Sequence, residues 1–232
     1  MTPAYSESSP PRKRRQTARQ SGGCLSGFLL PPLAALCVGL LLAIWAGGLS
    51  DSPRAEALPI LPVASSGQIA PLFTPEVQFW GANLARWAAE HGLDANLAAT
   101  VMQIESCGHP DIRSSAGATG LFQVMPFHFT AGEEMANPDT NALRGLDYLR
   151  RSLEQAAGDP RLAFAGYNGG IGVINQMESL WPAETIRYAY WGDGIYNDAR
   201  LNLSTSPRLQ EWLQAGGASL CAQARQRLGL GQ

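Results

Sequence analysis

Apolar side chains recur about one helical turn apart in several segments between residue 76 and the end of the chain. This spacing places them on one face of a helix, whereas the alternation typical of half-buried strands is scarce. The sequence therefore predicts a mainly α-helical domain that is long enough to bury a core. The predicted helices cover residues 76–91, 95–106 (capped by Asp94 or Asn96), 141–157, 160–168 and 206–228, the last with a possible break at Gly216-Gly217.

An uncharged apolar run, residues 25–49, precedes this domain. It exceeds the roughly 20 residues that a helix needs to cross a bilayer, so it predicts a transmembrane signal-anchor. Positive charges favour the cytoplasmic side, and segment 1–24 carries Arg12, Lys13, Arg14, Arg15 and Arg19. We expect residues 1–24 to be cytoplasmic and the chain after residue 49 to lie outside. The alternative is a secreted protein with a cleaved signal peptide, for which Ala55-Glu56-Ala57 offers a small-residue site, although the apolar run is longer than usual.

Residues 50–75 contain repeated prolines and show neither a helical nor a strand period. Such a composition predicts an extended linker between membrane and domain. After it we expect the folded domain at 76–198 and a C-terminal helical extension at 199–232.

The formal net charge is −2, but residues 51–232 carry 12 Lys and Arg against 18 Asp and Glu. Nucleic-acid binding requires clustered basic side chains, so this balance argues against it for the folded part. The arginine cluster near the N-terminus could contact RNA, but its position directly before the apolar run favours a role in membrane topology.

Four cysteines are present, of which Cys24 and Cys37 lie at or inside the apolar run. Cys107 and Cys221 are the pair in the exported part, where an oxidising compartment favours a disulfide. It would close a loop of more than 100 residues, which the chain-entropy model values at about 4–5 kcal/mol. The alternative is two unrelated free thiols.

Glu105 is the candidate catalytic side chain. In the helix 95–106 it lies on the shoulder of an apolar stripe made by Leu97, Val101 and Ile104. Partial burial disfavours the charged carboxylate and raises its pKa, as a general acid near neutral pH requires. Taken alone, the position fits a solvated or helix-capping glutamate as well.

The residues after Glu105 add to this picture. Gly117, Ala118 and Gly120 carry little side-chain bulk and would let the backbone approach a bulky ligand. Tyr167 and Asn168, just before a glycine-rich turn, supply hydroxyl and amide groups that suit sugar hydroxyls and N-acetyl amides.

These elements occur in the order typical of one family. Over roughly residues 77–197 the chain resembles the soluble lytic transglycosylase catalytic domain, which is related to goose-type lysozyme. The matching residues are Glu105-Ser106, Pro110, Ser114, Gly117-Ala118, Gly120-Leu121, Gln123, Met125-Pro126, Asn141, Gly145, Tyr148-Leu149, the segment 163–170, and Glu184-Thr185 with Tyr188. Phe122, Gly166 and Gly169 depart from the family pattern, which concerns packing and turn flexibility rather than chemical groups.

The resemblance implies a lysozyme-like fold and the role of each matching residue. Glu105 corresponds to a single catalytic acid and base, and Ser114 to a serine near that carboxylate. Gln123 and Met125 correspond to groups lining the cleft, and Tyr148, Tyr167 and Asn168 to residues around the sugar. The implied reaction is cleavage of the MurNAc-GlcNAc β-1,4 bond of peptidoglycan glycan strands, without a cofactor, leaving 1,6-anhydro-MurNAc ends.

Two other functions stay open. Glycosidases usually employ two carboxylates, so a second one facing Glu105 would permit hydrolysis of the lysozyme (muramidase) type. The candidates in sequence are Asp111, Glu133, Glu134 and Asp139, all expected on solvated loops. A non-catalytic wall-binding module is the other alternative. A place in an envelope-spanning machinery, with cleavage serving to open the wall, is compatible with the transglycosylase function.

Other kinds of site have little support. His91, His109 and His128 lack the spacing of metal ligands, so no metal site is expected. The aromatic residues at positions 80, 87, 181, 191 and 212 are expected in the core rather than as sugar platforms.

Overall fold

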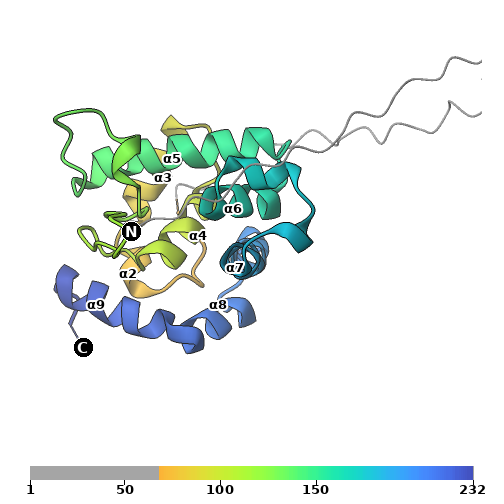
Figure 1. Cartoon of the computed structure of the whole chain (residues 1–232). Helices are drawn as coiled ribbons and strands as arrows, with labels where there is room; N and C mark the ends of the chain where they lie inside the picture. The colour runs from red at the N-terminus through yellow and green to blue at the C-terminus, as the bar shows by residue number, and fades with distance from the viewer. Residues whose placement is uncertain (1–67, 232) are drawn as a thin grey trace, which may run out of the picture. The chain divides into compact units, whose positions relative to one another are not determined.

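The computed structural model describes residues 68–231. Within this range the chain forms helices joined by loops, and its extended pairing is limited to isolated bridges around Thr119 (Figure 1). The helices are α2 (Pro75–Gln78), α3 (Gly81–Glu90), α4 (Ala95–Glu105), η1 (Pro126–His128), α5 (Pro138–Gln155), α6 (Pro160–Gly169), η2 (Ile171–Asn175), η3 (Glu178–Leu180), α7 (Ala183–Arg200), α8 (Pro207–Trp212), η4 (Leu213–Gly217) and α9 (Ala218–Leu228). The prediction of a mainly α-helical domain is confirmed.

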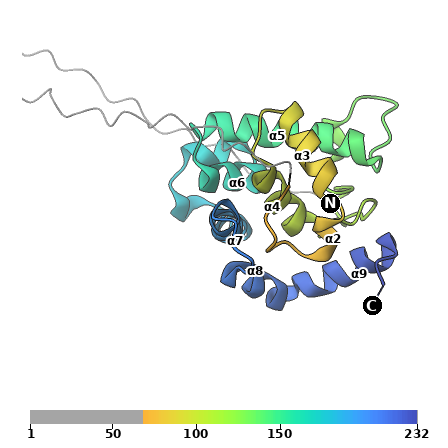
Figure 2. The ribbon, with the colours of Figure 1, turned by 180° about the vertical axis from the view of Figure 1, so that it is seen from behind.

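Helix α4 forms the centre of the fold. Its residues from Ala95 to Gln103 are all buried except Asn96, as expected for a helix that is apolar on most of its faces. Helices α3 and α5 cover one side of it and α8 and α9 the other, in both views (Figure 2). The largest fully buried side chains of the core include Trp87, Phe122 and Phe164.

Local signals in the sequence start several of these helices. The Asp94 carboxylate accepts hydrogen bonds from the backbone N–H groups of Asn96 (2.8 Å) and Leu97 (3.2 Å), so Asp94 is the cap of α4. The Asn96 side chain instead accepts from the backbone N–H of Ala70 (2.7 Å). Helices α5, α6 and α8 repeat one arrangement, with a capping side chain followed by proline, at Asn137, Asp159 and Ser206.

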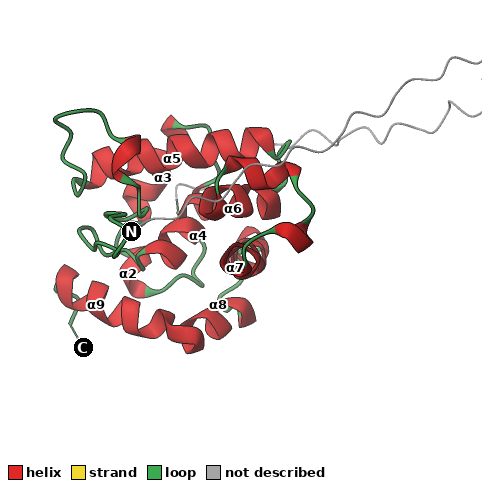
Figure 3. Ribbon diagram, in the orientation of Figure 1, coloured by secondary structure: helices red, strands yellow, loops and turns green. Residues whose placement is uncertain are grey.

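Two predicted features of the helices differ in the structure, and one helix was not predicted. The predicted helix 76–91 is interrupted at Phe79 and Trp80, where the Trp80 indole N–H donates to the Gly108 carbonyl (2.8 Å). Leu143 lies at helical spacing from Leu146 in the predicted helix 141–157 but is 48% exposed, because the buried face of α5 is centred on Leu146 and Leu149. Helix α7 was not predicted at all (Figure 3).

The boundaries of the folded part also differ from the expected ones. Ile69, Leu72 and Phe73 are buried in the core, so folding begins before Pro75, inside the segment that the sequence assigns to the linker. The predicted break at the glycine pair is confirmed, because a kink at Gly216 (φ 127°) inside the π-helical turn η4 separates α8 from α9.

The membrane predictions fall on other residues. None of the helices in the range 68–231 combines the length and the apolar character needed to cross a bilayer. The predicted cytoplasmic segment 1–24, the predicted transmembrane segment 25–49 and the linker up to residue 67 lie outside the described residues.

The tryptophans are placed largely as expected. Trp80, Trp87, Trp181 and Trp212 are buried, and Trp191 is half-buried and packs against the main core.

Candidate active site

Glu105 is the last residue of α4 and is half-buried, with part of its surface open to solvent. Desolvation raises its pKa to about 8. The Tyr188 hydroxyl opposes this shift and the charge of Glu184 adds to it. The carboxyl group is therefore mainly protonated at neutral pH, which is the state that a general acid needs.

Two tyrosines lie close to this carboxyl group, Tyr167 from α6 and Tyr188 from α7. Burial, reinforced by the charge of Glu105, raises the pKa of both phenols well above the usual value. The Tyr167 hydroxyl donates to the Phe122 carbonyl (2.7 Å). The Tyr188 hydroxyl is buried and has no hydrogen bond of regular geometry to any described residue. The hydroxyl nevertheless lies close enough to Glu105 to lower the pKa of the carboxyl group.

The loop that follows α4 is held by polar side chains. The Ser106 hydroxyl donates to the Leu121 carbonyl (2.7 Å), and the Gln123 amide donates to the carbonyls of Ile112 and Gly120 (both 3.1 Å). From α5, the buried Asn141 accepts from the Phe122 N–H (2.8 Å) and donates to the Thr119 carbonyl (2.7 Å). These bonds fix the backbone beside Glu105.

Gly120 is required by the packing of this loop, and its role toward a ligand stays a prediction. Its φ is 83°, and a Cβ atom there would lie 2.5 Å from Nδ2 of Asn141. Only glycine allows the chain to turn and to approach Asn141 so closely.

The departures from the family pattern have similar packing causes. At Gly166 a Cβ atom would lie 2.3 Å from the Ser152 hydroxyl oxygen, and at Gly169 it would lie 2.7 Å from the Thr185 hydroxyl oxygen. Alanine does not fit at either position unless Ser152 or Thr185 moves.

The structure brings together some of the site residues that the sequence suggested. The ring of Tyr148 packs edge-on against that of Tyr167, with centroids 5.7 Å apart. The Asn168 amide oxygen accepts from the Thr185 hydroxyl (2.8 Å) and so joins α6 to α7. The Ser114 hydroxyl accepts from the Ala118 N–H (3.0 Å) inside the loop. Met125 is half-buried and precedes η1. The roles of these residues toward a substrate stay predictions.

The comparisons with known proteins point to the same part of the chain. The family model described as Transglycosylase SLT domain matches residues 82–188. This range includes Glu105, the loop that follows α4, Tyr167 and Tyr188. Over these residues the chain is therefore similar to a transglycosylase SLT domain. A transglycosylase of Enterobacteria phage PRD1 is 35% identical over 111 residues, which are 47% of this chain and 40% of that protein.

A solved structure is also similar. It is the inactive mutant of the lytic transglycosylase Slt from Pseudomonas aeruginosa, at 28% identity and a TM-score of 0.44, over 55% of this chain and 25% of that chain. The chain thus spans less than half the length of either relative.

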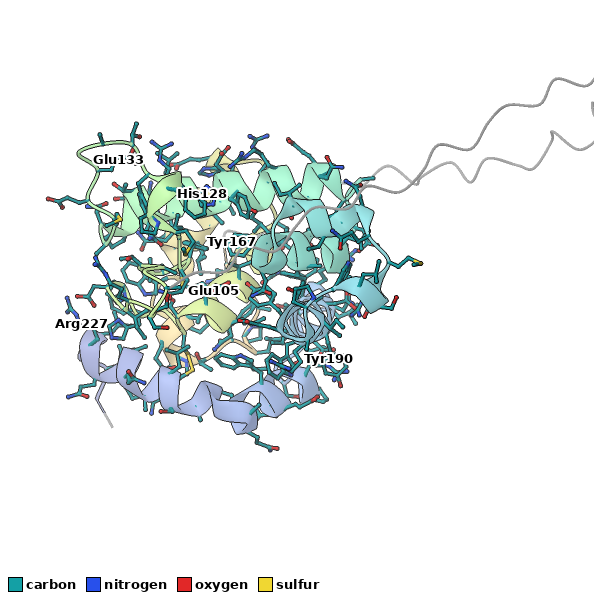
Figure 4. The ribbon with its side chains drawn as sticks, in the orientation of Figure 1. Glu105, His128, Glu133, Tyr167, Tyr190 and Arg227 are labelled. Atoms are coloured by element: carbon teal, nitrogen blue, oxygen red, sulfur yellow. A yellow bond between two sulfur atoms is a disulfide. The ribbon has the colours of Figure 1, made fainter. Side chains whose placement is uncertain are left out.

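Most of the expected second carboxylates are held in contacts away from Glu105. Asp111 pairs with Arg227, Glu133 with Arg144, and Asp139 with Arg86. These hydrogen bonds lower the pKa of Asp111 and Asp139 and bring that of Glu133 to about 2. Asp139 also lies in the first turn of α5, not on a loop, and Glu133 is only 24% exposed. Figure 4 shows Glu133 and Arg227 at the periphery, away from Glu105.

Sequence reasoning missed two residues of the candidate site, Tyr188 and Glu184. Both belong to the matching element Glu184-Thr185 with Tyr188, to which the family resemblance gave no role at the site. In the structure this element forms the first two turns of α7, so that Glu184 and Tyr188 both act on Glu105. Their spacing of four residues is the signal that could have placed them on one helix face.

Two other features of the described residues are separate from Glu105. Glu76, Cys107 and Cys221 lie close enough together to suggest metal ligands, but Cys107 and Cys221 are joined in a disulfide. A cavity of about 1030 Å³ lies between α2 and α9, lined by residues that include Pro75 and Arg225 but not Glu105. The candidate site is therefore identified by the environment of the carboxyl group and not by cavity size.

Proposed function

We propose that the chain is a peptidoglycan lytic transglycosylase that cleaves the MurNAc-GlcNAc β-1,4 bond and leaves 1,6-anhydro-MurNAc ends. The observation that carries this proposal is the position of Glu105, whose carboxyl group is kept protonated near neutral pH beside the buried Tyr188 and the partly buried Tyr167. The SLT domain supports peptidoglycan as the substrate class.

In this mechanism one carboxyl group performs both proton transfers. Glu105 donates its proton to the glycosidic oxygen as the bond from this oxygen to C1 breaks and the electron pair leaves with the oxygen. The C6 hydroxyl oxygen of the same MurNAc ring then bonds to C1, and its proton passes to the Glu105 carboxylate. No water is consumed and Glu105 is regenerated. Because the attacking hydroxyl belongs to the substrate, the step gains the advantage of an intramolecular reaction.

Hydrolysis of the lysozyme type is the second candidate, and Glu184 is the observation that favours it. Its charge raises the pKa of Glu105, so Glu184 is a second carboxylate in the neighbourhood of the candidate acid, and a hydrolase needs two carboxylates. Glu184 is exposed at the start of α7. Replacement by glutamine would abolish a hydrolase that depends on this base, whereas a transglycosylase keeps its activity.

We further propose that the domain works outside the cytoplasm, anchored by residues 25–49. The Cys107–Cys221 disulfide supports this location, because such bonds persist in oxidising compartments. The anchor rests on the sequence pattern of residues that the structure does not describe.

The Glu105→Gln variant tests the proposed function. It removes the transferable proton with little change of volume, so we expect the full-length variant to fold. The natural chain should reduce the turbidity of purified sacculi, and the variant should not. Undiminished clearing by Glu105→Gln would reject the assignment. Binding of sacculi without clearing by the natural chain would favour the wall-binding module.

A further inference from the structure

Four aromatic side chains form a continuous row that begins at the surface and ends at Glu105. The ring centroids of Phe127 and His128 are 4.5 Å apart, those of His128 and Tyr148 4.7 Å, and those of Tyr148 and Tyr167 5.7 Å. Tyr167 in turn is close enough to Glu105 for the carboxylate to raise its pKa. Figure 4 shows His128, Tyr167 and Glu105 in this succession, from α5 toward α4. We call these four residues the aromatic row.

The outer end of the aromatic row is held in place by its own backbone. Phe127 lies on the short helix η1, where the His128 N–H donates to the Met125 carbonyl (3.0 Å). The next residue, Phe129, packs against the main core. Phe127 consequently points outward from an anchored turn, with 75% of its surface exposed.

An isolated exposed aromatic residue needs no functional explanation. Phe127 differs because it continues a series of ring contacts that leads to the candidate catalytic group. His128 and Tyr148 are half-buried, so each keeps one part accessible along this line. The guanidinium carbon of Arg151 lies 5.4 Å from the Tyr148 ring centroid and supports that ring.

The chemistry of the aromatic row suits a sugar chain. Pyranose rings have apolar C–H faces and polar edges, and aromatic side chains with a polar tip offer the matching surfaces. Burial and the charge of Arg151 lower the pKa of His128, so its imidazole is neutral at pH 7 and can both donate and accept hydrogen bonds.

We propose that the aromatic row is an extended binding path for the glycan strand, in which Phe127 stacks on a sugar several units from the bond that is cleaved. This inference rests on the proposed function, because it places the cleaved bond at Glu105. Phe127 is then a specificity-determining residue that makes long strands bind better than short ones.

The test is calorimetric binding of chitotriose and chitohexaose to the full-length chain carrying Glu105→Gln, which cannot cleave them. Adding Phe127→Ala should weaken chitohexaose binding about tenfold and leave chitotriose binding unchanged, because the trimer does not reach the outer end. Phe127→Tyr should retain the affinity. Phe79→Ala removes another exposed phenylalanine (51%) outside the row and should have no effect.

Three results would overturn the inference. Unchanged chitohexaose affinity in Phe127→Ala would show that no sugar stacks there, while the proposed function would stand. Equal weakening of both oligomers, with an unchanged circular dichroism spectrum, would place Phe127 near the cleaved bond and not at a distance. Failure of either oligomer to bind the Glu105→Gln chain at all would contradict the proposed function together with this inference.

Discussion

The Cα atoms of Cys107 and Cys221 lie 5.0 Å apart, and the disulfide between them ties the segment directly after Glu105 to α9. Two ion pairs act beside it, from Arg225 to the buried Glu76 (2.6 Å) and from Arg227 to Asp111 (2.8 Å). Helix α9 lies beyond the residues that match the SLT family model. The C-terminal extension therefore fastens the backbone on both sides of α4.

Removal of this disulfide should destabilise the fold. The bond spans 114 residues, so the double variant Cys107→Ser/Cys221→Ser is expected to lose about 4 kcal/mol of the free energy of unfolding. Urea denaturation with and without reductant measures this loss. Reductant should lower the midpoint of the natural chain and leave that of the double variant unchanged. Equal midpoints for the two chains would show that the bond does not form.

Gly120→Ala should destabilise the loop beside Glu105 by about 3 kcal/mol, because it combines a positive φ with a collision against Asn141. Gly132→Ala is the matched control, since Gly132 has a similar φ of 89° but no atom within 4 Å of the added Cβ. The control should lose only about 1 kcal/mol. Thermal unfolding compares the two variants, and equal losses would contradict the close contact with Asn141.

Glu105→Gln should stabilise the protein at neutral pH. The folded pKa of about 8 lies above the unfolded value of about 4.3, so between these values the folded state binds more protons. The free energy of unfolding of the natural chain therefore falls as pH rises through this window. The glutamine variant does not show this fall, because its side chain does not titrate. The expected gain is roughly 2–4 kcal/mol at pH 7. Urea unfolding at about pH 5 and about pH 8 measures the difference in unfolding free energy between the variant and the natural chain. Glu134→Gln, at an exposed position, is the control. A difference that becomes smaller at the higher pH would contradict the raised pKa of Glu105.

Tyr188→Phe should shift the pH dependence of cleavage. The Tyr188 hydroxyl lowers the pKa of Glu105, so its removal raises that pKa further and moves the alkaline limb of the rate profile to higher pH. Tyr190→Phe serves as control, because the Tyr190 hydroxyl donates to Glu211 (3.2 Å) at the surface. A limb that moves to lower pH would show that Tyr188 stabilises the protonated acid instead.

Features with strong local signals could be read from the sequence. The apolar stripe around Leu97 and Val101 predicted a buried α4, and the same stripe implied a raised pKa for Glu105. The Cys107–Cys221 disulfide was predicted because these are the two cysteines of the part expected in an oxidising compartment, and the structure confirms the bond.

Helix α7 escaped prediction for a physical reason. Its buried face is formed by Thr185, Tyr188, Ala189, Gly192, Ile195, Tyr196 and Ala199, a set with helical spacing but few large aliphatic side chains. Small residues are used there because α6 is close: a Cβ atom on Gly192 would lie 2.7 Å from the Phe164 ring. Hydropathy patterns do not register such a face, so helix α7 was not predicted, and the four-residue spacing of Glu184 and Tyr188 was the one signal for their shared helix face.

The central claim is that one carboxyl group, Glu105, both donates and recovers a proton without water. Mass spectrometry of muropeptides released from purified sacculi by the full-length chain tests it most directly. The account predicts products that end in 1,6-anhydro-MurNAc, lighter by one water than hydrolytic ends, and none from the Glu105→Gln variant. Hydrated ends from the natural chain, or anhydro ends from the variant, would contradict it.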